Sequence, residues 1–229
     1  MTGVNFLSGP LEKAKIYKEG ENALVTISYQ GDEINSVVMS DHYRLDKEVL
    51  LFAAFALLLI VVAGKNGFLA IFSFAITVLT LWKILVPAYL NGYSPIWIGI
   101  IITIFLTLMI IFFVYGFDRR TVTASLGSLL GIFTTCILGM LFTDLFKING
   151  AVMPDSESLL YSGFQNLDLT AIFMSSIFIG ASGAMMDLSV DITSAVHEVV
   201  EKKPDISWKE AAKSGMNVGR AAMGTMTTT

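Results

Sequence analysis

Long apolar runs separated by short polar stretches fill the chain from position 49 onward. A helix needs about 20 apolar residues to cross the hydrocarbon core of a bilayer, so runs of this length predict transmembrane helices. The predicted spans cover residues 49–63, 68–86, 96–115, 122–145 and 169–190. We therefore expect an all-α transmembrane bundle of about five spans, with the start of a sixth span at residues 215–229.

Polar segments punctuate these runs. Gly64-Lys65-Asn66-Gly67 predicts a tight turn, and Pro87 is expected to end the second span. Small residues in 122–145 predict close helix packing. Ser207 followed by Glu210 is a capping-box pattern, which predicts a helix start inside the charged, cytoplasmic helical segment 199–214.

The first 48 residues follow a different pattern. Residues 23–29 and 34–39 have strand composition and flank a turn at 30–33, which predicts a β-hairpin. Two strands alone are not stable in water, and no signal peptide or apolar run precedes position 49. We therefore expect 1–48 to be part of an extracytoplasmic β-rich segment, and the chain to be incomplete at both ends.

Composition agrees with the span pattern. Hydrophobic residues make up 54% of the 229 residues and charged residues only 15%, whereas soluble domains have about 25% charged residues. The net charge of −4, with no basic stripe, argues against nucleic acid as a partner. The single cysteine, Cys136, excludes an internal disulfide. The composition therefore indicates a multi-pass protein with the lipid bilayer as its surroundings.

Basic residues in the short loops predict the orientation in the cell membrane. The loops expected in the cytoplasm are 64–67, 116–121 and 191–215, which carry most of the basic residues near the spans. Residues 1–48 are then outside. Arg44 and Lys47 beside the first span favour the opposite placement, but three consistent loops outweigh this one flank.

A polar stripe lies at the end of the last full apolar run. Its members share one helical face: Ser176, Gly180, Gly183, Asp187, Asp191, Ser194 and Glu198. A carboxylate in or at the edge of a membrane helix is energetically costly, which makes Asp187 and Asp191 a functional hypothesis. Because these two carboxylates are one turn apart they repel each other, and this favours proton binding by the pair.

Other residues complete the candidate ion, proton or substrate site. Arg220 is expected at a similar membrane depth as a counter-charge, and Asn217 as a hydrogen-bond donor to the same carboxylates. Gly180 and Gly183 would let a solute or another backbone approach. Thr225 and Thr227 line a polar pathway or serve interhelical hydrogen bonds.

A purely structural interpretation stays open for the same residues. Asp187 and Asp191 would then be hydrated at the cytoplasmic end of the span, or would pair with Arg220 to lock two helices. His197 lies roughly 80° off the stripe and, with Glu198, is at most accessory. The spacing predicts no metal site beyond a hard cation held with water, and no cofactor is expected.

Several segments carry a family resemblance. They are residues 180–192, 204–207, 213–220 and 224–227, together with 42–45 and 92–95. These segments resemble the YibE/F family of bacterial membrane proteins. The resemblance implies an upstream membrane anchor, an external β-rich domain and further helices after the Gly-Thr-Met-Thr motif at 224–227.

A fainter likeness concerns the acidic residue in a glycine-rich helix followed by Gly219 and Arg220. This pattern is similar to the membrane core of resistance-nodulation-division permeases and SecD/SecF, which use intramembrane acidic groups for proton-coupled movement. We expect a transporter or permease-like protein for a small solute or ion, and the sequence leaves open whether it forms a homo- or hetero-oligomer. The alternative is a non-transporting scaffold that presents an external β domain. No catalytic triad order or nucleotide-binding loop is present, so we do not expect an enzyme.

Overall fold

The computed structural model describes residues 15–30, 33–154 and 156–226, and the chain divides into two units at Leu59/Ile60. In the first unit, strand β1 (Ala23–Gln30) pairs antiparallel with β2 (Glu33–His42), and helix α1 (Leu45–Thr80) begins. This two-stranded sheet confirms the predicted hairpin. The tip of its turn, residues 31–32, lies outside the described residues.

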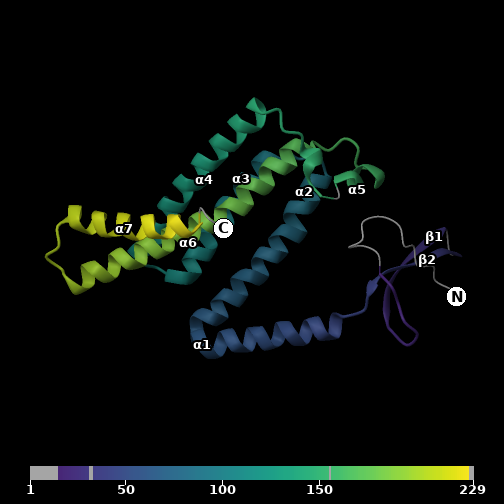
Figure 1. Cartoon of the computed structure of the whole chain (residues 1–229), viewed down its shortest axis with the longest axis horizontal. Coiled ribbons are helices and arrows are strands. Elements are labelled where there is room, and N and C mark those ends of the chain that lie inside the picture. Colours follow the sequence, from purple (N-terminus) through teal and green to yellow (C-terminus); the bar gives the residue numbers. More distant parts are fainter. Residues whose placement is uncertain (1–14, 31–32, 155, 227–229) are drawn as a thin grey trace. The chain divides into compact units, whose positions relative to one another are not determined.

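The second unit is helical (Figure 1). After α1 come η1 (Leu81–Leu85), α2 (Val86–Leu90), α3 (Pro95–Tyr115), α4 (Arg119–Leu145), η2 (Gly150–Val152), α5 (Ser156–Tyr161), α6 (Leu169–Lys202) and α7 (Trp208–Met226). Helix α6 packs against α3, α4 and α7, so it is the central element of this unit. The architecture confirms the predicted helical bundle.

Four stretches in the described part of the chain are long and apolar enough to cross a membrane. They are Leu45–Leu90, Pro95–Tyr115, Arg119–Leu145 and Leu169–Lys202. The first has 46 residues, which at 1.5 Å per residue would extend about 69 Å, more than twice the hydrocarbon thickness. Within it, Gly64 adopts φ 56° and ψ −126°, a non-helical conformation that glycine reaches without a Cβ penalty. The expected turn at 64–67 is thus reduced to one residue, and the division into five spans stays a prediction.

Pro87 does not end the second apolar helix, contrary to the sequence-based expectation. The helix continues to Leu90, and Pro87 lies in the first turn of α2, directly after the π-helical turn η1. In this turn the Val86 N–H donates to the carbonyl of Leu81, five residues earlier. The wider turn accommodates a proline ring that would clash in a regular α-helix.

Helices α6 and α7 form a hairpin whose second helix begins as predicted. The Ser207 hydroxyl accepts from the Glu210 N–H at 3.3 Å, and a Glu210 carboxylate oxygen accepts from the Ser207 N–H at 3.4 Å. This reciprocal pair confirms the capping box. Helix α7 then continues through Gly215, where the sequence suggested the start of a new span, because that glycine packs against α6 instead of ending a helix.

Glycines on α4 allow close contact with α6. A Cβ on Gly131 would lie 2.8 Å from the Met185 sulfur, and one on Gly139 would lie 3.2 Å from the Phe178 ring. Both distances are shorter than ordinary van der Waals contact, so a side chain at either position would require the Met185 or Phe178 side chain to shift. The close packing predicted for the small residues in 122–145 is therefore confirmed.

Candidate functional site

Apart from Ser194, which the Tyr115 hydroxyl contacts, the polar stripe lies on a face of α6 that the described part of the chain leaves open. Asp187 and Asp191 are exposed, and a Cβ built on Gly180 or Gly183 would meet no described atom within 4 Å. The opposite side of the helix holds the buried residues, among them Ser175, Phe178, Ser182 and Met186. Helix α6 thus has one packed face and one open face, and the acidic residues lie on the open one.

Tyr115, at the end of α3, contacts α6 at Val190 and Ser194, and this contact defines a reference level along α6. The Tyr115 hydroxyl donates to the carbonyl of Val190 at 2.7 Å and lies 2.5 Å from the Ser194 hydroxyl. The Arg120 guanidinium lies 5.1 Å from the centre of the Tyr115 ring. Tyrosine and arginine are typical of the membrane–water interface. Asp191 follows Val190 and is therefore at the level of Tyr115 along α6.

Asp187 is four residues before Asp191 on the same helix, on the apolar side of that level. Four residues of helix correspond to about 6 Å. A carboxylate on the apolar side of such a level is energetically costly in a membrane, which makes Asp187 the stronger candidate of the two.

Helix α7 packs on α6 through small residues. Ala211 is buried, and a Cβ on Gly215 would lie 2.7 Å from a Val196 methyl group, while one on Gly219 would lie 3.0 Å from the Ile192 Cδ1. Ala211, Gly215 and Gly219 are spaced four residues apart, which is the small-residue pattern of close helix pairs. These residues define the packed face of α7.

The structure does not bring Arg220 to the carboxylates. Arg220 and Asn217 lie roughly 140° and 160° around α7 from the centre of its packed face, and both are exposed. On α6, Ile192 and Val196 likewise lie nearly opposite the stripe. Arg220 follows Gly219, which contacts Ile192, so Arg220 and Asp191 are at similar levels along α6. The helix faces that carry Arg220 and Asp191 nevertheless point away from each other.

Two further candidates sit on α7 or beyond it. Thr225 is in the last turns of α7, and Thr227 lies outside the described residues. Their role in a polar pathway stays a prediction.

His197 and Glu198 form exposed pairs along α6. His197 Nε2 is 3.9 Å from a Glu201 carboxylate oxygen, and the Lys202 ammonium donates to Glu198 at 2.5 Å. Such i, i+4 pairs add a small stabilisation to the polar last turns of α6, which ends at Lys202. Among the described residues, no three His, Cys, Asp or Glu side chains gather as a metal site would require.

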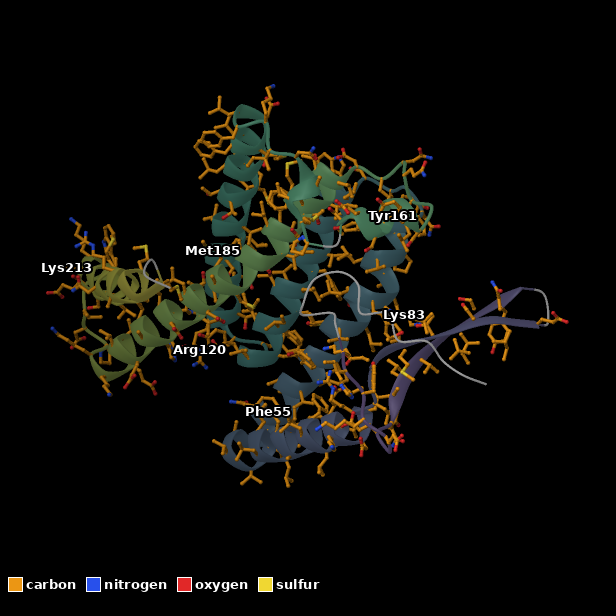
Figure 2. The ribbon with its side chains drawn as sticks, turned by 45° about the vertical axis from the view of Figure 1, so that its right-hand side comes forward. Phe55, Lys83, Arg120, Tyr161, Met185 and Lys213 are labelled. Atoms are coloured by element: carbon orange, nitrogen blue, oxygen red, sulfur yellow. The ribbon has the colours of Figure 1, made fainter. Side chains whose placement is uncertain are left out.

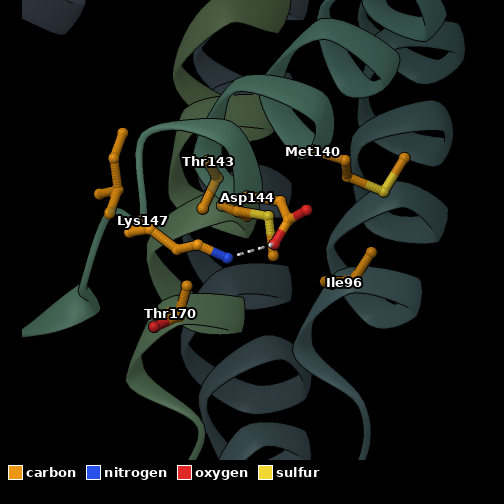
Figure 3. Close-up of a pocket in the computed structure, with 8 residues that line it drawn as sticks. Ile96, Met140, Thr143, Asp144, Lys147 and Thr170 are labelled. Carbon is orange, nitrogen blue, oxygen red and sulfur yellow. Dashed lines mark ion pairs between the residues drawn. The ribbon is translucent and has the colours of Figure 1, made fainter.

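A cavity of about 490 Å³ opens at the end of α6 opposite to the stripe's acidic end (Figure 3). Ile96, Thr143 and Thr170 line it, and an ion pair of 3.9 Å joins Lys147 to Asp144 at its rim. Both charged side chains are almost fully exposed, so the pair contributes little to stability. The sequence did not predict this cavity, because its walls come from three separate helices.

A second cavity, of about 270 Å³, lies between α6 and the start of α4, next to the turn that joins α3 to α4. Its lining residues are Arg119, Arg120, Thr123, Ile192, Thr193, Val196, His197 and Val200. Figure 2 labels Arg120 at this turn and Met185 on the packed face of α6. The Arg120 Nε donates to Asp118 at 2.6 Å, and this hydrogen bond holds the pKa of the Asp118 carboxyl below its usual range. Sequence reasoning used the two arginines only to predict orientation.

Comparison with protein families now adds to this geometry. The family of YibE/F-like proteins matches residues 51–229, which include the stripe, both cavities and α7 up to its end. The chain belongs to the YibE/F-like family. The match begins after the β-hairpin, so residues 42–45 lie outside it. Comparisons with curated proteins and with solved structures gave no match.

The YibE/F-like chain is therefore a helical membrane protein, and its interior contains hydroxyl groups that the sequence did not single out. Thr103 and Thr107 on α3 and Ser128 on α4 are almost fully buried, and none has a hydrogen-bond partner among the described residues. Nearby, Tyr89 and Ser175 hydrogen-bond to each other through their hydroxyls. The sequence offered little reason to single out these residues, because isolated Thr and Ser are common in membrane helices.

Proposed function

We propose that this YibE/F-like protein moves a small solute or ion across the membrane and couples this movement to protonation of Asp187. The observation that carries the proposal is the place of Asp187, about 6 Å inside the level of Tyr115 and on the open face of α6. An ionisable group in an apolar span is costly and therefore marks a functional site by default.

The open face supplies room beside the carboxylate. Gly183 and Gly180 lie about one and two turns from Asp187 towards the apolar centre of the helix, with no described atom near their missing side chains. A solute, an ion or another helix can approach the backbone there. Protonation would neutralise Asp187 and lower the cost of apolar surroundings, so the bound proton would favour one of two arrangements of this face.

The same proposal includes a location and an orientation. We place the protein in the cell membrane, with the turn that bears Arg119 and Arg120 in the cytoplasm and residues 1–48 outside. The basic residues of the short loops support this placement. Asp187 would then be reached from the cytoplasmic side.

The test uses the full-length chain in proteoliposomes that enclose a pH-sensitive dye. An imposed membrane potential drives proton entry, and a panel of small ions and solutes is added in turn. We expect at least one of them to start acidification by the wild-type protein. Asp187→Asn, which cannot bind a proton, is expected to reduce this acidification to the level of protein-free liposomes.

Asp144→Asn is the matched control, because Asp144 is an exposed carboxylate at the other end of the bundle. It should leave proton entry unchanged. Acidification by Asp187→Asn at the wild-type rate would contradict the proposal, as would a wild-type protein that moves no protons with any solute. If Asp187→Asn lowered only the thermal stability, the scaffold function would be the better interpretation.

A further inference from the structure

The cavity at the start of α4 has two chemically different walls. The polar wall of the cavity is formed by Arg119, Arg120 and Thr123 from the first turns of α4. Helix α6 adds Thr193 and His197 to this polar wall. Three aliphatic side chains, those of Ile192, Val196 and Val200, complete the α6 wall. A ligand that fills this space must therefore be anionic or polar at one end and apolar at the other.

Among the charged residues around the cavity, Arg119 has no acidic partner in the described part of the chain. Asp118 balances Arg120 through a hydrogen bond of 2.6 Å. Glu201, near His197, is 76% exposed and does not line the cavity. In the described part of the chain Arg119 has no ion-pair or hydrogen-bond partner for its side chain. Arg119 and the outer nitrogens of Arg120 are thus available as donors, and a guanidinium can bind a phosphate through two parallel hydrogen bonds.

The position of the cavity fits a phospholipid. Thr193 is next to Ser194, which contacts Tyr115 at the level of the membrane boundary. Lipid phosphates lie at this boundary, and basic pockets between membrane helices bind anionic headgroups. The volume of about 270 Å³ is at the small end for ligand pockets, which suits a headgroup better than a whole solute.

We propose that this cavity binds the headgroup phosphate of an anionic phospholipid, held by Arg119 and Arg120. Thr193 offers a hydroxyl to the same oxygens, whereas the Thr123 hydroxyl donates to the Arg119 carbonyl at 3.1 Å. Ile192, the aliphatic lining residue nearest the level of Tyr115, contacts the start of the acyl chains. The proposal depends on the membrane location of the chain and not on protonation of Asp187.

Native mass spectrometry of the full chain, released from nanodiscs with equal amounts of phosphatidylglycerol and phosphatidylcholine, tests this site. We expect the wild-type protein to retain phosphatidylglycerol in preference to phosphatidylcholine. Arg119→Gln should weaken this retention about tenfold or more, because a hydrogen bond to a charged group is lost. Its side chain is exposed and unpaired among the described residues, so the variant should unfold at the wild-type temperature.

Lys213→Gln removes an exposed positive charge from α7, outside the cavity, and is the matched control. It should retain phosphatidylglycerol like the wild type. Equal retention of both lipids by the wild type, or unchanged retention by Arg119→Gln, would overturn the proposal. Competition with inorganic phosphate separates the two sources of this chemistry: full displacement of the lipid by the free ion would show a site for phosphate itself and would also overturn it.

Discussion

The two faces of α6 differ in how they use the same kinds of residue. On the packed face, Phe178 is fully buried, and Ser175 contacts α3, where a Cβ on Gly99 would overlap its side chain. On the open face, Gly180 and Gly183 have no described neighbour at the corresponding position. Both faces are rich in small residues, but only the small residues of the packed face contact other helices of the described chain.

This difference separates two reasons for a small residue in a membrane helix. A glycine that meets a neighbouring helix is required for stability, because a side chain there would push the helices apart. A glycine on an open face with Asp187 adds nothing to the packing of the described chain. Its presence is better explained by what approaches the carboxylate, and substitutions can separate these two reasons.

Truncation of the packed face should have the largest effect. Phe178→Ala removes a ring that is fully buried between α6 and its neighbours, and we expect a loss of about 3–5 kcal/mol in the free energy of unfolding. An unfolding titration in mixed micelles measures it. Phe133→Ala, on a side of α4 where the ring is 64% exposed, is the control and should change little. Equal effects of the two variants would remove the distinction between the faces.

The next effect concerns the contact of η2 with the start of α6. A Cβ on Gly150 would lie 2.1 Å from the backbone carbonyl of Leu169, and backbone atoms cannot rotate away. Gly150→Ala should therefore cost about 3 kcal/mol, at the upper end of typical overpacking. The same titration with Gly180→Ala, which adds a methyl group on the open face, should show no loss. A tolerated alanine at position 150 would contradict this contact.

A smaller effect is expected where α7 packs on α6. Gly215→Ala places a methyl group against Val196, at 2.7 Å. We expect a loss of about 1 kcal/mol, because the gain in helix propensity offsets part of the clash. The measurement is protease sensitivity of α7 together with unfolding. If α7 is detached from α6, Gly215→Ala will behave like an ordinary stabilising helix substitution.

A substitution on the open face should change the free energy of unfolding least, and it should raise this free energy instead of lowering it. Gly183→Ala meets no described atom and replaces a poor helix former, so a gain of less than about 1 kcal/mol is expected. Proton entry into proteoliposomes should nevertheless fall, because the methyl group narrows the approach to Asp187. Normal proton entry together with a large loss of stability would mean that another part of the protein covers this face.

The features that were predicted correctly from the sequence are those that neighbouring residues determine. The Ser207–Glu210 capping box and the hairpin of residues 23–39 are set by neighbouring residues, and both are present. The predicted span 96–115 nearly coincides with α3 at Pro95–Tyr115. The family was also evident from contiguous segments.

The face that each helix presents could not be predicted in the same way. Arg220 and Asp191 are at similar levels along α6, as expected, but point apart because Ala211, Gly215 and Gly219 turn the small-residue face of α7 towards Ile192 and Val196. That orientation is decided by a neighbour distant in the sequence. The cavity with Arg119 and His197 was missed for the same reason, since its walls come from α4 and α6.

The π-turn before Pro87 amounts to a one-residue insertion in a helix. Every side chain after Leu85 is rotated by about 100° relative to where an uninterrupted α-helix would place it. Tyr89 follows this turn, and its hydroxyl meets Ser175 in the gap left by Gly99. Deletion of one residue from this turn would therefore restore an uninterrupted α-helix and swing Tyr89 away from the helix that carries Asp187.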